Sequence, residues 1–205
     1  MSAFVRPLAA VVLMIVLTLA SAATAQPKPV TADDMRMGNP KAAVTVIEYA
    51  SLACPHCGAW DREVWPAFKA KYVDTGKVNY VFREFITSPP ELAAMGVLVA
   101  RCAGPGQYFS VIDQVFKAQE QIYTTQDMGP SFKAIAAKVG LSDAQLNACI
   151  GDEAALRALN ERVNRWVNVE HIRATPTFVV NGTVLEGEQS LAALDAAIAA
   201  TQAKK

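Results

Sequence analysis

Cys54 and Cys57, one helical turn apart, are the residues whose type and spacing best support chemistry. Pro55 follows Cys54 and suits the first turn of a helix, because the N–H that proline lacks has no partner there. The start of a helix offers free N–H groups and the positive end of the helix dipole, and both stabilise a thiolate. We therefore expect Cys54 to be the nucleophile and Cys57 the more shielded thiol. His56 would add a dipole or, when protonated, a positive charge beside the thiolate.

A stabilised thiolate favours the reduced form of such a pair. Each unit by which the thiol pKa falls is worth about 1.4 kcal/mol, or about 30 mV for a two-electron couple once the pKa lies below ambient pH. A Cys54–Cys57 disulfide would then pass readily to another dithiol, with Cys54 as a good leaving group. This disulfide would be the reactive group, and we expect no separate cofactor.

Other uses of a C-x-x-C pair fit the sequence less well. A zinc site would need a second ligand pair, but no second C-x-x-C and no H-x-x-x-H is present, so we expect no metal. A c-type haem needs histidine directly after the second cysteine, where this chain has Gly58. A purely structural bridge across so few residues would remove little chain entropy.

The elements around the pair predict a βαβ unit. The run 44–49 is β-branched and aromatic, as in a buried strand, and the polar, proline-containing segment 26–40 that leads into it is expected to carry no strand. A helix should run from Cys54 to Gly76 with a kink at Pro66. A second strand at 78–85 would lie parallel to the first.

The remaining chain predicts a helical block and then a return to β structure. Helices are expected from Pro89 to the Gly-Pro-Gly stop at 104–106, at 108–121, 131–139 and 153–172, with a capping box at 142–145. Strands at 177–180 and 183–186 flank Asn181-Gly182, a type I′ hairpin signal, and Ser190 can cap a last helix at 191–203. The organisation is therefore α/β: βαβ, an all-helical insert, then ββα.

Composition and the N-terminus bound the location and the partners. The 205 residues carry 19 Lys+Arg against 19 Asp+Glu, so we expect neither a nucleic-acid nor an anionic-membrane partner. Residues 1–25 have Arg6, an apolar run at 8–19 and an A-x-A pattern at 23–25, which predict a cleaved secretory signal peptide. The alternative is an uncleaved anchor. Export would place the four cysteines in an oxidising compartment, where disulfides persist.

Two motifs more than 100 residues apart, C-P-H-C at 54–57 and T-P-T-F at 175–178, resemble the DsbA family of thiol–disulfide oxidoreductases. The resemblance extends from about Gly38 to the last helix. It implies a thioredoxin fold in two segments, 26–87 and 173–205, interrupted by a helical domain at 88–172. It also implies a periplasmic monomer that donates disulfides to reduced, unfolded exported proteins. A DsbB-type membrane protein linked to quinone would reoxidise it.

The resemblance also assigns the site. Cys54 would be the attacking cysteine and Cys57 the resolving one, with Pro55 and His56 tuning the pair. Thr175 and Pro176 would form a cis-proline loop that faces the disulfide and offers backbone groups to an extended substrate. An ordinary trans proline at the start of an edge strand is the alternative, because cis X-Pro bonds are uncommon.

Glu48 matches the family's buried acid beneath the active site, where a carboxyl with a raised pKa could relay the proton of Cys57. The alternative is a strand-end glutamate paired with a surface lysine. The family's lysine partner is missing from the second strand, where Arg83 is the only cation. Cys102 and Cys149 would ordinarily pair in an exported chain, and some relatives have such a second bridge; two buried free thiols are the alternative.

Two other functions stay open. A disulfide isomerase or reductase of the same superfamily would share the C-P-H-C site, but isomerases usually add an oligomerisation segment before the thioredoxin fold. Residues 26–43 are short for such a segment and show no heptad pattern. A metal-handling binding module, with copper or zinc held at 54–57, has only the two thiols and His56 in its favour.

Overall fold

The structure is a computed structural model that describes residues 29–203. The signal peptide predicted at 1–25 lies outside the described residues. Within them the strands form one mixed sheet in the order β1-β3-β2-β4-β5. β2 and β3 are parallel, and the other neighbours are antiparallel. The strands are β1 Met35–Gly38, β2 Val44–Ala50, β3 Val78–Glu84, β4 Thr177–Val180 and β5 Thr183–Glu186.

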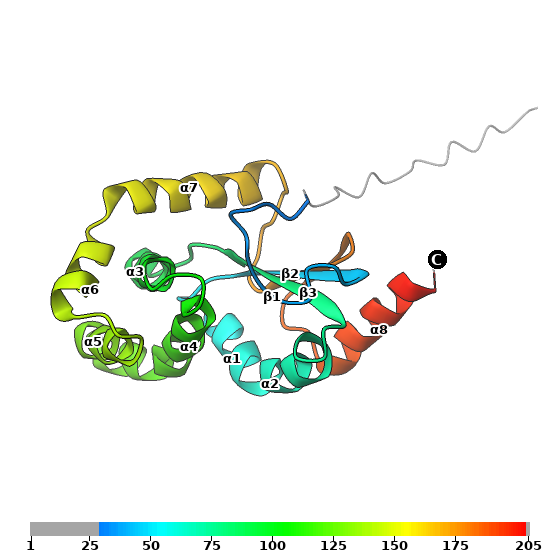
Figure 1. Ribbon diagram of the computed structural model, residues 1–205, viewed down its shortest axis with the longest axis horizontal. Coiled ribbons are helices and arrows are strands. Elements are labelled where there is room, and N and C mark those ends of the chain that lie inside the picture. Colours follow the sequence, from blue (N-terminus) through cyan, green and yellow to red (C-terminus); the bar gives the residue numbers. More distant parts are fainter. Residues whose placement is uncertain (1–28, 204–205) are drawn as a thin grey trace, which may run out of the picture.

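Helices lie on both sides of this sheet (Figure 1). α1, α2 and α8 lie on one side, α7 lies on the other, and α3 to α6 gather at one end. We call α3 to α7, residues 90–168, the helical insert. The bounds are α1 Pro55–Glu63, α2 Trp65–Phe68, the π-helix η1 Lys69–Val73, α3 Pro90–Cys102, α4 Tyr108–Thr125, α5 Gly129–Lys138, α6 Asp143–Ile150, α7 Glu153–Asn168 and α8 Leu191–Gln202.

The alternation of side chains along β2 divides the core between the two faces of the sheet. Val46 and its neighbours on the same face join the larger core, which includes Trp60 of α1. Ile47 and Tyr49 point to the other face and pack in a smaller core with Trp166 of α7. This alternation places residue 48 on the same face as the helix that carries the cysteine pair.

The predicted helix from Cys54 to Gly76 is broken into three pieces. Pro66 lies in the first turn of α2, where its ring excludes the helical carbonyl of the residue four positions earlier and it supplies no N–H. α1 therefore ends at Glu63, and after α2 the chain continues as the π-helix η1 to Val73. The kink predicted at Pro66 is confirmed, but the single continuous helix is wrong.

The expectation that segment 26–40 carries no strand is also wrong. β1 pairs with β3 as an edge strand, and Met35 and Met37 pack against the core while the residues between and after them are exposed. The sequence signal failed because the four residues MRMG contain neither a β-branched nor an aromatic side chain.

The last helix of the insert ends at Asn168 rather than at residue 172. The chain leaves the helix to bury Glu170, whose carboxylate accepts a hydrogen bond from Arg83 Nη1 at 2.8 Å. Arg83 also donates to both carboxylate oxygens of Asp34, and its guanidinium lies over the Trp166 ring at 4.4 Å. A buried charge needs such partners, so the contacts of Arg83 with Glu170 and Asp34 hold the turn between α7 and β4 in place.

Several local predictions are confirmed. Asn181 and Gly182 both have positive φ angles, 44° and 93°, as a type I′ turn requires. Ser142 and Gln145 form the reciprocal capping box of α6, and the Ser190 side chain caps α8. The predicted order of βαβ unit, helical insert and ββα is confirmed as well. Between residues 29 and 203, no helix is both long and apolar enough to cross a bilayer.

Candidate active site

Cys54 is the N-cap residue of α1, and Cys57 lies one turn into the helix. The two sulfurs are not bonded to each other, so the structure describes the dithiol form. Cys57 is fully buried and Cys54 is 7% exposed. Pro55 and His56 between them are exposed. The expectation that Cys57 is the more shielded sulfur is confirmed.

The surroundings of the two thiols separate their pKa values. A hydrogen bond from the Cys57 thiol is the main cause that lowers the pKa of Cys54 to about 5, against the opposing effect of burial. The Thr175 hydroxyl and the backbone N–H groups of Cys57 and His56 lower it further. Burial, with the hydrogen bond to Cys54, raises the pKa of Cys57 well above its ordinary value. At neutral pH the pair therefore holds one thiolate, on Cys54, and one thiol.

The loop before β4 brings Thr175 and Pro176 to the cysteine pair from 121 residues away. In its thiol form, Cys54 donates a hydrogen bond to the carbonyl oxygen of Thr175 at 3.3 Å. The Thr175–Pro176 peptide bond is cis, as predicted, and the trans alternative is wrong. The Ser88–Pro89 bond, before α3, is also cis and was not predicted. The Thr175 backbone thus lies against the Cys54 sulfur.

His56 has a partner that the sequence did not reveal. Its Nδ1 lies 2.5 Å from Oε1 of Glu188, in the loop between β5 and α8. The hydrogen bond and the charge of Glu188 raise the pKa of His56, and the Cys54 charge raises it further. A raised pKa keeps more of the imidazole protonated near neutral pH, so Glu188 favours the cationic form of the residue beside the thiolate.

Glu48 lies beneath the cysteine pair and is 1% exposed. It accepts a hydrogen bond from the Tyr80 hydroxyl, and burial raises the pKa of Glu48 to about 8. The alternative of a surface pair with a lysine is therefore wrong. Arg83 does not take the place of the missing lysine, because it is opposite Tyr49 in the β2–β3 register and bonds on the other face of the sheet.

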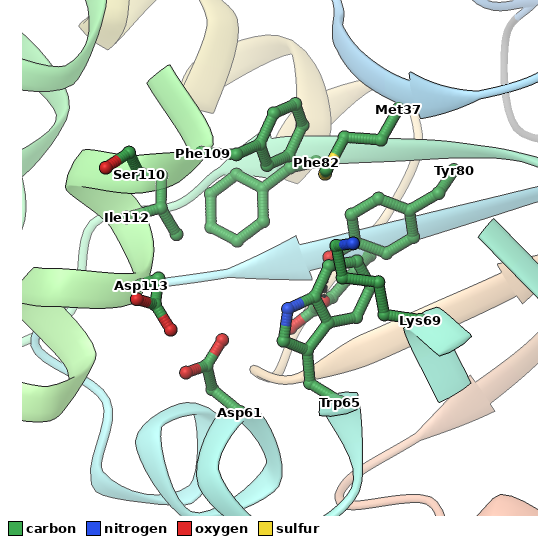
Figure 2. Close-up of a pocket in the computed structure, with 11 residues that line it drawn as sticks. Met37, Asp61, Trp65, Lys69, Tyr80, Phe82, Phe109, Ser110, Ile112 and Asp113 are labelled. Carbon is green, nitrogen blue, oxygen red and sulfur yellow. Dashed lines mark hydrogen bonds between the residues drawn. The ribbon is translucent and has the colours of Figure 1, made fainter. Parts of the chain in front are cut away.

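Glu48 is one of the residues that line a cavity of about 320 Å³, which Figure 2 shows in close-up. Its walls include aromatic side chains from α2, β3 and α4, and Asp61 and Asp113 point towards one another across it. Asp61 is 8% exposed, and its Oδ2 has no hydrogen-bond partner. Burial and the charge of Asp113 raise the pKa of Asp61 to about 7. The lining thus includes both the buried Glu48 and the exposed Ser110 of α4.

Cys102 and Cys149 form a disulfide between the end of α3 and the end of α6. Their Cα atoms lie 5.8 Å apart. The expected pairing is confirmed, and the alternative of two free thiols is wrong. This bridge lies within the helical insert and leaves Cys54 and Cys57 as the free cysteines of the described chain.

Two side chains of α4, which the sequence analysis did not single out, also reach the site. Gln119 and Tyr123 donate hydrogen bonds to backbone carbonyls of residues 52–54. Their place on a core-facing helix gave no signal of this contact, because it depends on how the insert packs against α1. Between residues 29 and 203, no group of three or more His, Cys, Asp or Glu side chains is arranged to hold a metal ion.

Comparison with known proteins agrees with this geometry. The family model described as Thioredoxin matches residues 30–200. The chain belongs to the thioredoxin family. It is similar to the crystal structure of Wolbachia pipientis alpha-DsbA1, with a TM-score of 0.76 and 28% identity over 87% of this chain and 94% of that one. The oxidised BdbD structure from Bacillus subtilis, at 20% identity, shares the fold with a TM-score of 0.73 over 87% of this chain and 97% of that one.

A curated relative is also similar in sequence. A putative protein-disulfide oxidoreductase of Rickettsia conorii is 30% identical over 167 residues, which cover 81% of this chain. The chain matches 59% of that relative's length. The predicted resemblance to DsbA proteins and the thioredoxin fold with a helical insert are confirmed by these findings.

Proposed function

We propose that the protein is a dithiol:disulfide oxidoreductase that acts in the periplasm and donates the Cys54–Cys57 disulfide to reduced exported proteins. One observation carries this proposal. The low-pKa sulfur of Cys54 lies 3.3 Å from the Thr175 carbonyl, directly before cis-Pro176. Thr175 is half-buried and Ala174 before it is exposed. A nucleophilic sulfur beside this loop suits exchange with a cysteine in an extended chain.

The reaction starts from the oxidised pair. A substrate thiolate attacks Sγ of Cys54, a mixed disulfide forms, and the Cys54–Cys57 bond breaks with its electron pair going to Cys57. Cys57 has a raised pKa and therefore takes a proton, for which the Glu48 carboxyl is the nearby acid. The second thiolate of the substrate then attacks the substrate sulfur of the mixed disulfide and releases Cys54. The substrate gains a disulfide, and the enzyme ends with a Cys54 thiolate and a Cys57 thiol.

The difference between the two pKa values gives the reaction its direction. Cys54 leaves as a stabilised thiolate, which needs no proton, so its release in the second step is favoured. Glu188 raises the pKa of His56 and so favours the imidazolium, whose positive charge supports the same anion. Reoxidation then requires an electron acceptor, and we propose a quinone-linked membrane protein of the DsbB type.

The experiment is the oxidation of a reduced peptide with two cysteines, using purified protein in its oxidised form. Cys54→Ser should abolish the reaction. Cys57→Ser has no Cys54–Cys57 disulfide to donate, so it should leave the reduced peptide unchanged. Mixed instead with a peptide whose cysteine is already in a disulfide, its Cys54 thiolate should displace one sulfur of that disulfide and form a mixed disulfide with the peptide, visible by mass spectrometry. Peptide oxidation by Cys54→Ser at the wild-type rate would refute the assignment of the nucleophile.

A further inference from the structure

Two side chains of the helical insert donate hydrogen bonds to the backbone of Cys54 and of the two residues before it. Gln119 Nε2 donates to the carbonyl oxygen of Leu52 at 2.9 Å and to that of Cys54 at 3.1 Å. The Tyr123 hydroxyl donates to the carbonyl of Ala53, between them. Three consecutive carbonyls are thus held by two side chains of α4, and Gln119 is 2% exposed.

A glycine in α1 makes room for this contact. A Cβ atom at Gly58 would lie 2.2 Å from Oε1 of Gln119 and 3.0 Å from Nη1 of Arg62. No real Cβ contact is as short as the first distance, so any side chain at position 58 would displace Gln119. Arg62 Nη1 also donates to the Phe116 carbonyl of α4 at 3.3 Å. The insert and the cysteine-bearing helix therefore fit together at residues 58 and 119.

The hydrogen bonds from Gln119 and Tyr123 hold the backbone geometry that stabilises the Cys54 anion. Cys54 is the N-cap of α1 with φ −85° and ψ 118°. The backbone N–H groups of His56 and Cys57 are among the causes that lower the pKa of its thiol. A shift of residues 52–54 would move the sulfur relative to these donors and to Thr175. The two α4 side chains also offset the partial negative charge of three carbonyls beside the anion. Loss of these hydrogen bonds should therefore destabilise the Cys54 thiolate, both by shifting the backbone and by removing the compensating donors.

We propose that Gln119 and Tyr123 of the helical insert are positioning residues that set the reactivity of Cys54 by fixing the carbonyls of residues 52–54. The proposal rests on the proposed function, because it concerns the same nucleophile. It gives the insert a part in tuning the redox pair.

The first test removes the donors while keeping the side-chain shape. Gln119→Met and Tyr123→Phe are compared with Gln121→Met, on an exposed position of the same helix, and with Tyr72→Phe, whose hydroxyl bonds to Asp195 instead. The pKa of Cys54 is measured from thiolate absorbance, and the disulfide equilibrium is measured against glutathione. We expect Gln119→Met to raise the pKa of Cys54 by about one unit and to shift the equilibrium about tenfold towards the disulfide. Tyr123→Phe should produce a smaller change in the same direction, and both controls should match the wild type.

The second test uses coupling between the two helices. Gly58→Ala should displace Gln119 and raise the pKa of Cys54 as Gln119→Met does. In a Gln119→Ala background, Gly58→Ala should add little, because the colliding side chain is gone. An equal effect of Gly58→Ala in both backgrounds would overturn the proposal.

The outcomes separate this proposal from the proposed function. Folded Gln119→Met and Tyr123→Phe variants with an unchanged Cys54 pKa would overturn the role of α4, even if the wild type oxidises peptides as expected. Should Gln119→Met not fold, Tyr123→Phe alone decides, since it removes one hydroxyl from a half-buried ring. Loss of stability without a change in the pKa or in the glutathione equilibrium would show a structural role only and would also overturn the proposal.

Discussion

The difference in the free energy of unfolding between the reduced and the oxidised form should change sign between pH 5 and pH 7. Folding depresses the pKa of Cys54 to about 5, whereas an unfolded thiol ionises near 8.5. A group whose pKa is lowered by folding stabilises the folded state fully above its unfolded pKa and loses that effect as pH falls through its folded pKa. The oxidised form has no thiol at Cys54 and lacks this contribution at every pH.

The magnitude follows from the two pKa values. At pH 7 the folded thiolate contributes about 2 to 3 kcal/mol to the free energy of unfolding of the reduced protein, and near pH 5 it contributes less than about 0.5 kcal/mol. The bridge closes a loop of only four residues, 54–57, which stabilises the oxidised form by about 2 kcal/mol in the chain-entropy treatment. The reduced form should therefore be the more stable by about 1 kcal/mol at pH 7 and the less stable by a similar amount at pH 5.

Denaturant unfolding of both redox forms at several pH values between 5 and 7 measures this difference. Glu48 and Asp61 have raised pKa values, so they stabilise the folded state below their unfolded pKa values and lose that effect as pH rises through about 8 and 7. Both redox forms share these two carboxyls, and their contribution largely cancels in the difference. A gap between the two forms that stays constant across this pH range would refute an activated thiolate on Cys54.

Three further predictions follow from the other contacts. Glu48→Gln should slow release of the Cys57 thiol during peptide oxidation by about a hundredfold below pH 8, because an amide supplies no proton, and should remove the inflection of the rate near that pH. Stopped-flow rates measured across pH test this. An unchanged pH profile would exclude Glu48 as the acid. Glu188→Gln should lower the pKa of His56 towards its ordinary value, which an NMR titration of the imidazole would show; no change would mean that the ion pair does not form in solution. Replacing both Cys102 and Cys149 by serine should cost about 4 kcal/mol of unfolding free energy, because they lie 47 residues apart along the chain, and should leave the glutathione equilibrium of the active pair unchanged.

Much of the site was predictable because it depends on local sequence. The C-P-H-C tetrad contains its own helix start, so the N-cap position of Cys54 and the greater burial of Cys57 follow from position along one turn. The cis bond at Pro176 and the burial of Glu48 required the resemblance to a family, since neither proline geometry nor burial of a single acid can be derived from composition.

The parts that were missed depend on packing between distant elements. Gln119 lies 65 residues from Cys54, and Glu188 lies 132 residues from His56, so no local pattern joins either pair. Arg83 could have been placed better, because strand alternation puts it opposite Tyr49 and away from Glu48. β1 escaped notice because an edge strand of four residues is held by its pairing with β3 more than by its own propensities.

The reduction potential of the Cys54–Cys57 pair, measured against glutathione at pH 7, tests the central claim most directly. A low-pKa nucleophile stabilises the dithiol, so we predict a potential well above that of glutathione, with the protein mostly reduced even when oxidised glutathione is in excess. A pair that stays oxidised in an excess of reduced glutathione would contradict the account, because such a protein could not donate its disulfide.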